Sequence, residues 1–515
     1  MKNIIRLMIF LFMMVVGHGA HGQIPNTKMV YGKPSAATVK YFNPILPDFV
    51  ADPSVAMFND TFYLYGTTDI NQGLEKMGPP VVWKSTDFAN WSFSGTLIED
   101  IDWNTPYGYT DAKGVEKKGY FRYWAPGKAL FRDGKYYLFP TIVKPDESMG
   151  TYVMVAESPE GPFRFTNGQG IFFNRPEMIS VETKPLIDDI DGEPFVDDDG
   201  QAYVFWRRRN AARLSADWLS LGDKAIGIPT SFGGYSEGPV MFKRNGLYYY
   251  VYTLSGNANY CNGYMISRQS PLGPFEKPAG KGIFIYSDLE RGIWGPGHGN
   301  VFQMPGTDDF YFLYLEYGEG GTTRQVFVNK MEFDANGAIE PMKVDFNGVG
   351  HLKNGMDFKQ NLAFTAKASA SSHMDGKKVT AIIAPDPNVL KTIKVNAENG
   401  KTVERWKDYV PENALDGRNG TCWRAAPNDS LRQFTVDLGV PVAVSQCEMA
   451  FTLPTYGHTW MIEKSNDGKR WKVCARQDDM KICSPHVANG IGKARYLKLT
   501  IMQGEPGLWE FKIYK

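Results

Sequence analysis

Apolar and polar residues alternate over short stretches along most of this chain, and tight-turn residues separate these stretches. The clearest example is 190–205, where two apolar runs flank Asp-Asp-Asp-Gly. Alternation with a period of two predicts strands, and an Asp-Gly pair between two such runs predicts a tight β-hairpin. The same pattern predicts four further hairpins, at 58–65, 131–139, 242–252 and 302–314.

The five hairpins follow one another with no helical segment between them, which is typical of a β-propeller built by radial repetition of small sheets. A second repeat agrees, because Ser-Pro-x-Gly-Pro-Phe occurs at both 158–163 and 270–275. Proline suits the exposed edge of a sheet, so each copy is expected at the outer edge of a blade. The alternative is chance similarity between unrelated hairpins. We predict an all-β, five-bladed β-propeller over residues 40–350.

The hairpin repeat ends near residue 354, and different strand patterns follow. Alternating segments at 434–439, 463–471 and 494–499 predict a second all-β domain, a β-sandwich over 360–515. Long helical patterns are absent from both parts of the sequence.

The first residues predict export. A charged start at Met1–Arg6 precedes a short apolar run, Leu7–Val16, and small residues follow at Gly17–Gln23. This is the pattern of a signal peptide, here 1–22, and the apolar run is too short to span a membrane. The mature protein is expected to be periplasmic or secreted, with no membrane span.

Charge and cysteine content narrow the classes of partner. The chain has 56 Lys and Arg residues against 56 Asp and Glu residues and no basic stripe, which argues against nucleic acid and anionic membranes as partners. The sequence identifies no protein partner. Five cysteines cannot all pair within one chain, and the last four could form up to two disulfides whose pairing the sequence does not assign.

Three carboxylates stand where the innermost strand of a blade begins: Asp52, Asp191 and Glu237. In a propeller these strand starts converge near the axis, so the three side chains are expected to line one pocket. Hydrolysis of a glycoside requires one carboxylic acid to protonate the leaving oxygen and one carboxylate to activate water. A third carboxylate raises the pKa of the acid by repulsion between like charges. The alternative is that Asp52 and Asp191 only cap turns.

The first two thirds of the chain resemble glycoside hydrolase family 43. The resemblance rests on five motifs in the expected order: Ala-Asp-Pro-Ser at 51–54, Trp-Ala-Pro at 124–126, Ile-Asp at 190–191 with Phe-Val-Asp-Asp-Asp-Gly at 195–200, Glu-Gly-Pro at 237–239, and Gly-Pro-Gly-His-Gly at 295–299. It implies an inverting mechanism with Asp52 as general base, Glu237 as general acid and Asp191 as the residue that tunes and orients the acid. Gly192 stands where many members have proline, which leaves Asp188 and Asp189 as alternatives to Asp191.

The resemblance suggests further site residues. Trp124 and Trp294 are expected to form walls on which a sugar stacks, with burial in the core as the alternative. Arg324 matches a substrate-contacting arginine, with an ordinary surface position as the alternative. His298 is a candidate metal ligand near the axis, with a structural role as the alternative. No cofactor is expected for the chemistry, and a structural Ca²⁺ ion is compatible with the family.

One motif points to a different chemistry. Gly-Tyr-Ser-Glu-Gly at 234–238 fits the nucleophile elbow of an α/β-hydrolase. That motif requires a strand-to-helix turn, whereas Pro239 and a hairpin follow here. We therefore do not expect Ser236 to be a nucleophile.

The C-terminal part resembles the discoidin, or coagulation-factor type C, domain, a group that includes carbohydrate-binding modules. The likeness rests on Glu-Asn-Ala-Leu-Asp-Gly at 412–417, Trp423, Val-Asp-Leu-Gly at 436–439, Ser-Asn-Asp-Gly at 465–468 and Ala-Arg-Tyr at 494–496. Glycan binding and a purely structural cap on the propeller both remain open.

The combined prediction is an exported, inverting exo-glycosidase that removes terminal sugars from plant-type oligo- or polysaccharides. Within the family we expect an α-L-arabinofuranosidase first, then a β-xylosidase, then a galactose-cleaving enzyme. The rival from another class is a non-catalytic glycan-binding protein.

Overall fold

The computed structural model describes residues 42–70, 73–166, 184–280, 282–319, 322–353, 360–387 and 395–515. The predicted signal peptide lies outside these residues. No helix in the described ranges is long and apolar enough to cross a membrane. The described cysteines, which are all five of the chain, are unpaired.

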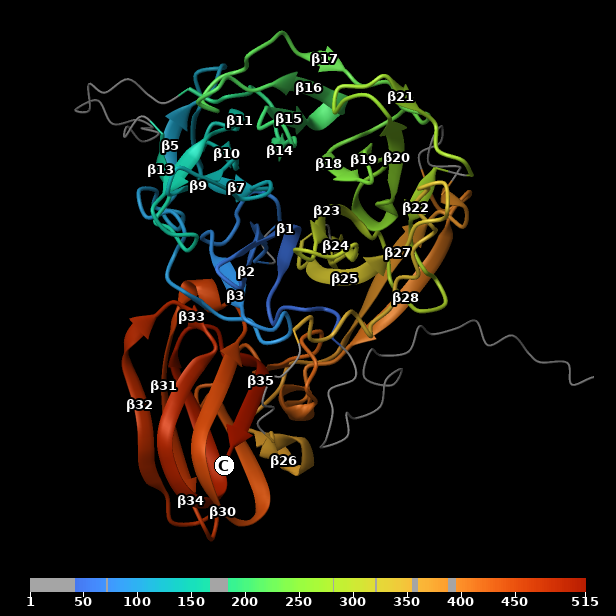
Figure 1. The fold of residues 1–515 in the computed structure, drawn as a ribbon. Coiled ribbons are helices and arrows are strands. Elements are labelled where there is room, and N and C mark those ends of the chain that lie inside the picture. The colour runs from blue at the N-terminus through green and yellow to red at the C-terminus, as the bar shows by residue number, and fades with distance from the viewer. Residues whose placement is uncertain are drawn as a thin grey trace, which may run out of the picture.

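Five blades of antiparallel strands surround a central axis, as predicted (Figure 1). The first blade holds β1 (Val50–Phe58), β2 (Thr61–Thr68) and β3 (Val82–Ser85). The third holds β14 (Glu193–Val196), β15 (Ala202–Trp206), β16 (Asn210–Arg213) and β17 (Ile226–Gly227). The fourth holds β18 (Val240–Arg244), β19 (Leu247–Thr253), β20 (Asn262–Ser267), β21 (Phe275–Glu276) and β22 (Ile283–Ile285), and the fifth β23 (Gly297–Gln303), β24 (Phe310–Glu316) and β25 (Gln325–Met331).

The second blade is interrupted and forms two adjoining sheets. The inner one contains β7 (Arg122–Trp124), β10 (Thr141–Val143) and β11 (Met149–Thr151). The outer one contains β8 (Leu130–Arg132), β9 (Lys135–Leu138), β12 (Met154–Ala156) and β13 (Arg164–Phe165). A separate exposed hairpin, β5 (Tyr107–Thr110) with β6 (Glu116–Gly119), precedes this blade.

The predicted turns lie between the first two strands of the hairpins. Asn59 and Asp60, Asp133 and Gly134, and Asn245 and Gly246 all adopt positive φ. Two successive residues of this kind form the tight turn whose twist matches that of the flanking strands. Both Ser-Pro-x-Gly-Pro-Phe segments lead into the outermost strands β13 and β21, as expected.

The first described residues close the ring of blades against the fifth blade. The backbone N–H of Ile45 donates to the Val326 carbonyl at 2.9 Å. The Asn43 amide nitrogen donates to the Val328 carbonyl, also at 2.9 Å, and its oxygen accepts from the Val328 N–H at the same distance. The beginning of the propeller is thus joined to its last strand.

The C-terminal domain is a β-sandwich around its own apolar core. Its main sheet has the order β29 (Trp423–Arg424), β35 (Gly507–Tyr514), β30 (Gln433–Phe451), β34 (His486–Gln503), β31 (His458–Ser465) and β32 (Lys472–Lys481). β26 (Lys367–Ala370) pairs with β30. Short 3₁₀ turns η4 (Leu362–Thr365), η6 (Pro411–Leu415) and η7 (Pro454–Tyr456) connect the strands.

The sandwich is attached to the propeller by backbone and side-chain contacts. β33 (Cys483–Ser484) pairs with β4 (Phe93–Ser94) beside the first blade. The Asn419 amide donates to the Ile45 carbonyl at 3.0 Å, and the Gln325 amide donates to the Asn419 carbonyl at 2.9 Å. These bonds join the sandwich to the segment that closes the ring.

One hairpin departs from the predicted domain boundary. β27 (Lys377–Ile383) and β28 (Lys401–Lys407) pair only with each other and lie along the outer side of the fourth and fifth blades (Figure 1). Val379, Ala381 and Ile383 share an apolar cluster with Ala258 and Trp294 of the propeller. The predicted sandwich, residues 360–515, included this segment without predicting the hairpin, because a sequence pattern does not show which domain a segment packs against.

A buried ion pair anchors this hairpin. Arg405 of β28 donates to both carboxylate oxygens of Glu316 in β24, at 2.6 and 3.1 Å, and each side chain is 6% exposed. Glu316 also accepts from the backbone N–H of Trp294 at 3.1 Å. The pair therefore connects the hairpin to the chain just before the fifth inner strand.

We predict that Arg405→Ala lowers the free energy of unfolding by about 3–5 kcal/mol, because it leaves Glu316 as an unpaired buried charge. Urea denaturation followed by tryptophan fluorescence measures this loss. The control is Arg470→Ala, which removes an exposed ion pair with Asp467 and should change stability little. Equal effects of the two substitutions would contradict the anchoring role.

Candidate active site

Each blade has a residue close to the axis that lies in the left-handed region of backbone space. These residues are Asp52 (φ 50°), Ala125 (37°), Asp191 (64°), Gly238 (51°) and His298 (39°). Non-glycine residues are uncommon in this region, and such strained positions cluster at functional sites. The register of the β1–β2 pair shifts beside Asp52, and that of the β23–β24 pair shifts beside His298, as at β-bulges.

This equivalence corrects one detail of the sequence analysis. Asp52, Asp191 and His298 occupy matching positions in three blades, whereas Glu237 lies one residue before the matching position, which is Gly238. Sequence motifs place Glu237 near the strand start but do not show which residue takes the left-handed conformation.

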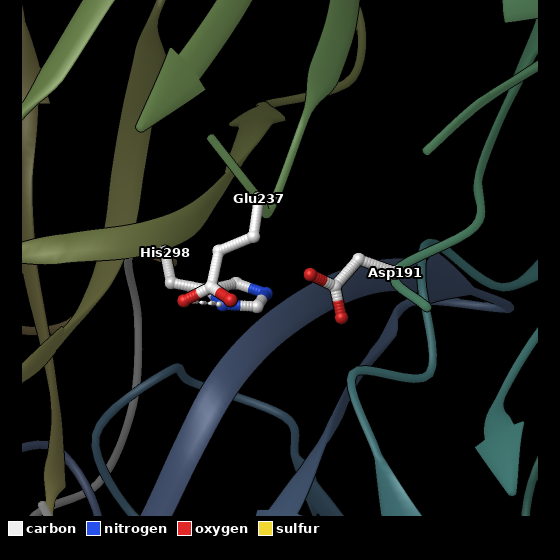
Figure 2. A group of neighbouring side chains, drawn as sticks. All are labelled: Asp191, Glu237 and His298. Atoms are coloured by element: carbon white, nitrogen blue, oxygen red, sulfur yellow. Dashed lines mark ion pairs between the residues drawn. The ribbon is translucent and has the colours of Figure 1, made fainter. Parts of the chain in front are cut away.

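The five strand starts surround a small cavity of about 20 Å³ on the axis. All five blades contribute to its wall: Asp52, Pro53, Ser54, Ala125, Gly127, Asp191, Gly192, Glu193, Gly238, Pro239, His298, Gly299 and Asn300. Figure 2 shows Asp191, Glu237 and His298 pointing toward one another, with ligand-type atoms all within 4.8 Å. The three sequence-predicted carboxylates are therefore brought together, and each is buried.

Asp52 is held by side chains of the first and fifth blades. Its Oδ2 accepts from the Thr67 hydroxyl at 2.6 Å, and its Oδ1 accepts from Arg324 Nη1 at 3.4 Å. His298 Nδ1 lies 3.3 Å from the same Oδ1. These contacts fix the orientation of the carboxylate that is predicted to act as the general base.

Glu237 is held by two tyrosines and one histidine. The Tyr235 hydroxyl donates to Oε2 and the Tyr260 hydroxyl donates to Oε1. His298 Nδ1 lies 3.7 Å from Oε1, which is the ion pair drawn in Figure 2. The backbone N–H of Glu237 donates to the Thr253 hydroxyl at 2.8 Å. Side chain and backbone are thus both fixed before a substrate binds.

His298 carries the positive charge of the cluster. Burial alone would lower its pKa, but the charges of Asp52 and Asp191 and the contact with Glu237 raise that pKa to about 10. The imidazole is therefore protonated at neutral pH. It faces both Asp52 and Glu237 and offsets the repulsion between them.

The two remaining carboxylates differ in protonation. Burial, assisted by the negative charges of Glu237 and Asp52, raises the pKa of Asp191 to about 7 against the opposing effect of His298. Burial acts in the same direction on Glu237, but the hydrogen bond and charge of His298 and the two tyrosine hydroxyls outweigh it, so the pKa of Glu237 is lowered. Of these two carboxyl groups, Asp191 therefore holds a proton more tightly than Glu237.

The structure decides between the neighbouring aspartates. Asp191 has its N–H bonded to the Thr141 hydroxyl at 2.9 Å, and its Oδ2 accepts from the Gly238 N–H at 3.1 Å. Asp189 instead pairs with Arg207 at 2.6 Å, and Asp188 is exposed. Asp191 is thus the aspartate beside Glu237.

Arg324 is a buried part of the site and not a surface arginine. It donates to both oxygens of Asp69, at 2.9 and 3.0 Å, as well as to Asp52. Asp69 is fully buried. This bidentate pair orients Arg324 toward Asp52, and a direct contact with substrate remains a prediction.

The two tryptophans differ. Trp294 is fully buried beneath Arg405, whose guanidinium carbon lies 4.6 Å from the ring centroid, so the prediction of a pocket wall is wrong for Trp294. The cause is the β27–β28 hairpin, which covers this face of the ring. Trp124 is half-buried next to the left-handed Ala125, and its role as a wall stays a prediction.

The donor set at the axis does not fit a calcium ion. Ca²⁺ takes six to eight oxygen ligands, whereas the group that converges here offers one ligand atom each from Asp191, Glu237 and His298, and the last is a nitrogen. The cavity is about the size of one water, and the buried Asn300 Oδ1 on its wall has no hydrogen-bond partner among the described residues. These features suit a bound water.

Sequence reasoning missed most of the supporting residues. Thr67, Thr141 and Thr253 all lie near the inner ends of second-layer strands, and each bonds a strand start. The signal was a threonine that follows the aromatic run of the first, second and fourth hairpins. Tyr260 and Asp69 gave no such signal, because both lie in connections whose path only the fold defines.

The comparisons identify relatives for both domains. The model of glycosyl hydrolases family 43 matches residues 41–339, more than half of the chain, and the F5/8 type C domain matches 392–511. A solved structure described as a glycoside hydrolase aligns with a TM-score of 0.78 and 41% identity, covering 91% of this chain and 98% of that one.

Two curated relatives match the propeller at lower identity. A β-D-galactofuranosidase of Aspergillus niger is 27% identical over 340 residues, covering 61% of this chain and 88% of the relative. An arabinoxylan arabinofuranohydrolase of Bacillus subtilis is 26% identical over 377 residues, covering 64% of this chain and 69% of the relative.

We predict that Asp191→Asn stabilises the protein more at pH 8 than at pH 5. The folded carboxyl keeps its proton up to about pH 7, whereas the ordinary value for the unfolded chain is 3.8. A raised folded pKa means that wild-type stability falls as pH rises through 7, and asparagine removes this loss. Urea denaturation at the two pH values measures the difference.

Asp133→Asn, at an exposed turn, is the matched control, and its effect should be the same at both pH values. A pH-independent effect of Asp191→Asn would contradict the raised pKa.

Proposed function

The chain belongs to glycosyl hydrolase family 43, and on this basis we propose that it is an exported, inverting exo-glycosidase that releases terminal α-L-arabinofuranosyl residues from plant-type polysaccharides. The observation that carries the proposal is the buried trio of Asp52, Asp191 and Glu237 around one imidazolium. Members of this family need no cofactor for the chemistry, and the proposal includes no calcium ion.

The proposed reaction uses two of the carboxylates directly. Asp52 accepts a proton from water, whose oxygen attacks the anomeric carbon from the face opposite to the leaving group. The bond between the anomeric carbon and the glycosidic oxygen breaks, and Glu237 donates its proton to that oxygen. One proton then returns from Asp52 through solvent to the acid, so the site is regenerated.

Asp191 supplies the third part of this mechanism. Because its carboxyl lies within 4.8 Å of Glu237 and shares a proton with it, the acid is the pair and not either residue alone. A substrate that displaces water and weakens the hydrogen bonds from Tyr235 and Tyr260 raises the proton affinity of Glu237. The proton then resides on the residue that faces the leaving oxygen.

Two of the curated relatives are named for furanosides, which supports a furanose as the released sugar, while others are named β-xylosidases. Arabinofuranose is the first candidate and galactofuranose the second, with a β-xyloside as the further alternative within the family. The rival role of a non-catalytic glycan-binding protein is disfavoured by the intact carboxylate trio.

The C-terminal domain is proposed to act first as a support. It holds the ring-closing segment through Asn419 and contacts the first blade through β33. Glycan binding by this domain remains a second proposal, which affinity electrophoresis of the full chain tests.

Export is proposed from the first 22 residues alone. Their charged start, apolar run and small residues suit cleavage by a signal peptidase. Intact-mass measurement of the protein recovered outside the cytoplasm tests this, and a full-length mass there would contradict it.

We predict that the wild type hydrolyses an aryl α-L-arabinofuranoside faster than the matching β-D-galactofuranoside or β-D-xyloside. Asp52→Asn should lower kcat/KM by about 10²–10⁴-fold on every leaving group, the usual range for loss of a general base. Glu237→Gln should lower kcat/KM by a similar factor when the leaving group is an alkyl alcohol. The loss of kcat/KM should be far smaller with dinitrophenol, because this group leaves without being protonated.

Proton NMR of the first sugar released should show inverted anomeric configuration. Ser236→Ala is the control for the rejected nucleophile and should retain the inverted product and activity of the same order. Activity that survives both Asp52→Asn and Glu237→Gln would overturn the mechanism. Hydrolysis of only a different sugar would overturn the proposed arabinofuranoside specificity and leave the mechanism unchanged.

A further inference from the structure

Three consecutive arginines lie between two of the catalytic strand starts. Arg207, Arg208 and Arg209 form the 3₁₀ turn η1 that connects β15 and β16 in the third blade. The N–H of Arg207 donates to the Ile190 carbonyl at 3.2 Å, and the N–H of Arg208 donates to the Ser236 carbonyl at 3.1 Å. The turn is therefore attached to the residues directly preceding Asp191 and Glu237.

A pocket of about 300 Å³ opens at this turn. Its lining consists of Arg207, Arg208, Arg209, Gly234, Tyr235 and Ser236. Tyr235 belongs both to this pocket and to the catalytic site, because its ring is half-exposed and its hydroxyl donates to Glu237. A volume of this size lies at the lower end for small-ligand sites, which suits a single sugar residue.

The positive charge of the pocket is only partly compensated. Arg207 pairs with Asp189 at 2.6 Å. Arg209 donates to the neutral carbonyls of Phe232 and Gly234 at 3.2–3.3 Å. The Arg208 side chain is exposed, and its guanidinium makes no hydrogen bond or ion pair with any described residue. Two guanidinium charges thus remain beside the catalytic acid without a carboxylate of their own.

The position of the pocket indicates which part of a substrate it would meet. A general acid lies on the side of the leaving group, and Tyr235 extends from that acid into the pocket. A sugar in this pocket therefore belongs to the portion of the polysaccharide that remains after cleavage. Guanidinium groups match carboxylates because their planar N–H donors bind two oxygens in parallel.

We propose that this pocket, which we call the arginine pocket, binds a uronic acid residue of the polysaccharide next to the bond that is cleaved. This inference rests on the proposed glycosidase function and names its substrate class: terminal furanosyl side chains carried by an acidic polysaccharide.

The test compares an arabinofuranosyl-substituted polysaccharide containing uronic acids with the same preparation after chemical reduction of its carboxyl groups to alcohols. The wild type should show kcat/KM about tenfold higher on the acidic form, the scale of a charge-assisted hydrogen bond. Arg208→Gln should bring this ratio close to one, and Arg208→Lys should give an intermediate value because it keeps charge but loses the planar fork. Added salt should lower the wild-type ratio by screening.

Arg268→Gln is the matched control, since it removes an exposed arginine of the same propeller, paired with Glu276 at 3.7 Å. It should keep the wild-type ratio. Equal rates of the wild type on both polymers would overturn the arginine pocket while leaving the glycosidase function intact.

Affinity electrophoresis in gels containing either polymer gives a readout that does not depend on turnover. Stronger retardation of the wild type by the acidic polymer, lost in Arg208→Gln, supports the pocket even if neither polymer is hydrolysed, an outcome that would count against the proposed activity alone. Equal retardation by both polymers, or a preference unchanged in Arg208→Gln, would overturn the proposal.

Discussion

The whole site depends on keeping buried negative charges close together at the propeller axis. Asp52 and Glu237 lie 3.3 and 3.7 Å from the same imidazole nitrogen of His298. Taking carboxylates out of water is costly unless opposite charge and hydrogen bonds accompany them. His298 and Arg324 supply the charge, and Asp191 lowers the remaining repulsion by keeping a proton. Each protonation state in the site is therefore a consequence of the others.

The propeller suits this demand because it brings five strand starts to one place while the core of each blade stays apolar. The left-handed residues at those starts turn successive groups toward the axis, and the threonines of neighbouring strands fix the backbone there. At the fifth blade, residues outside the propeller also help to fix the strand start. Arg405 from the β27–β28 hairpin bonds the same Glu316 that holds the Trp294 N–H, four residues before His298. The C-terminal half is thus connected to the position of the imidazolium.

The chemistry of the rim differs from that of the axis. At the axis each charge has a partner, and the geometry is set before a ligand arrives. At the arginine pocket Arg208 has none among the described residues, although its backbone is bonded next to Glu237. Charges that are already paired at the axis favour catalysis by groups fixed in place before substrate binds. Positive charge without a carboxylate partner at the arginine pocket favours recognition of an anion.

The amino-acid sequence by itself determined the all-β class, the five hairpins, the second domain and the carboxylates Asp52, Asp191 and Glu237, because alternation, turn residues and short motifs are local signals. Only the tertiary structure decided which residues surround those carboxylates. Tyr260, Asp69 and Arg405 come from segments far apart in the chain, and Trp294 is covered by a hairpin whose sheet partner the pattern does not reveal. The protonation of Asp191 and His298 was likewise undetermined, since a pKa depends on burial and on neighbouring charges that converge only when the ring of blades closes.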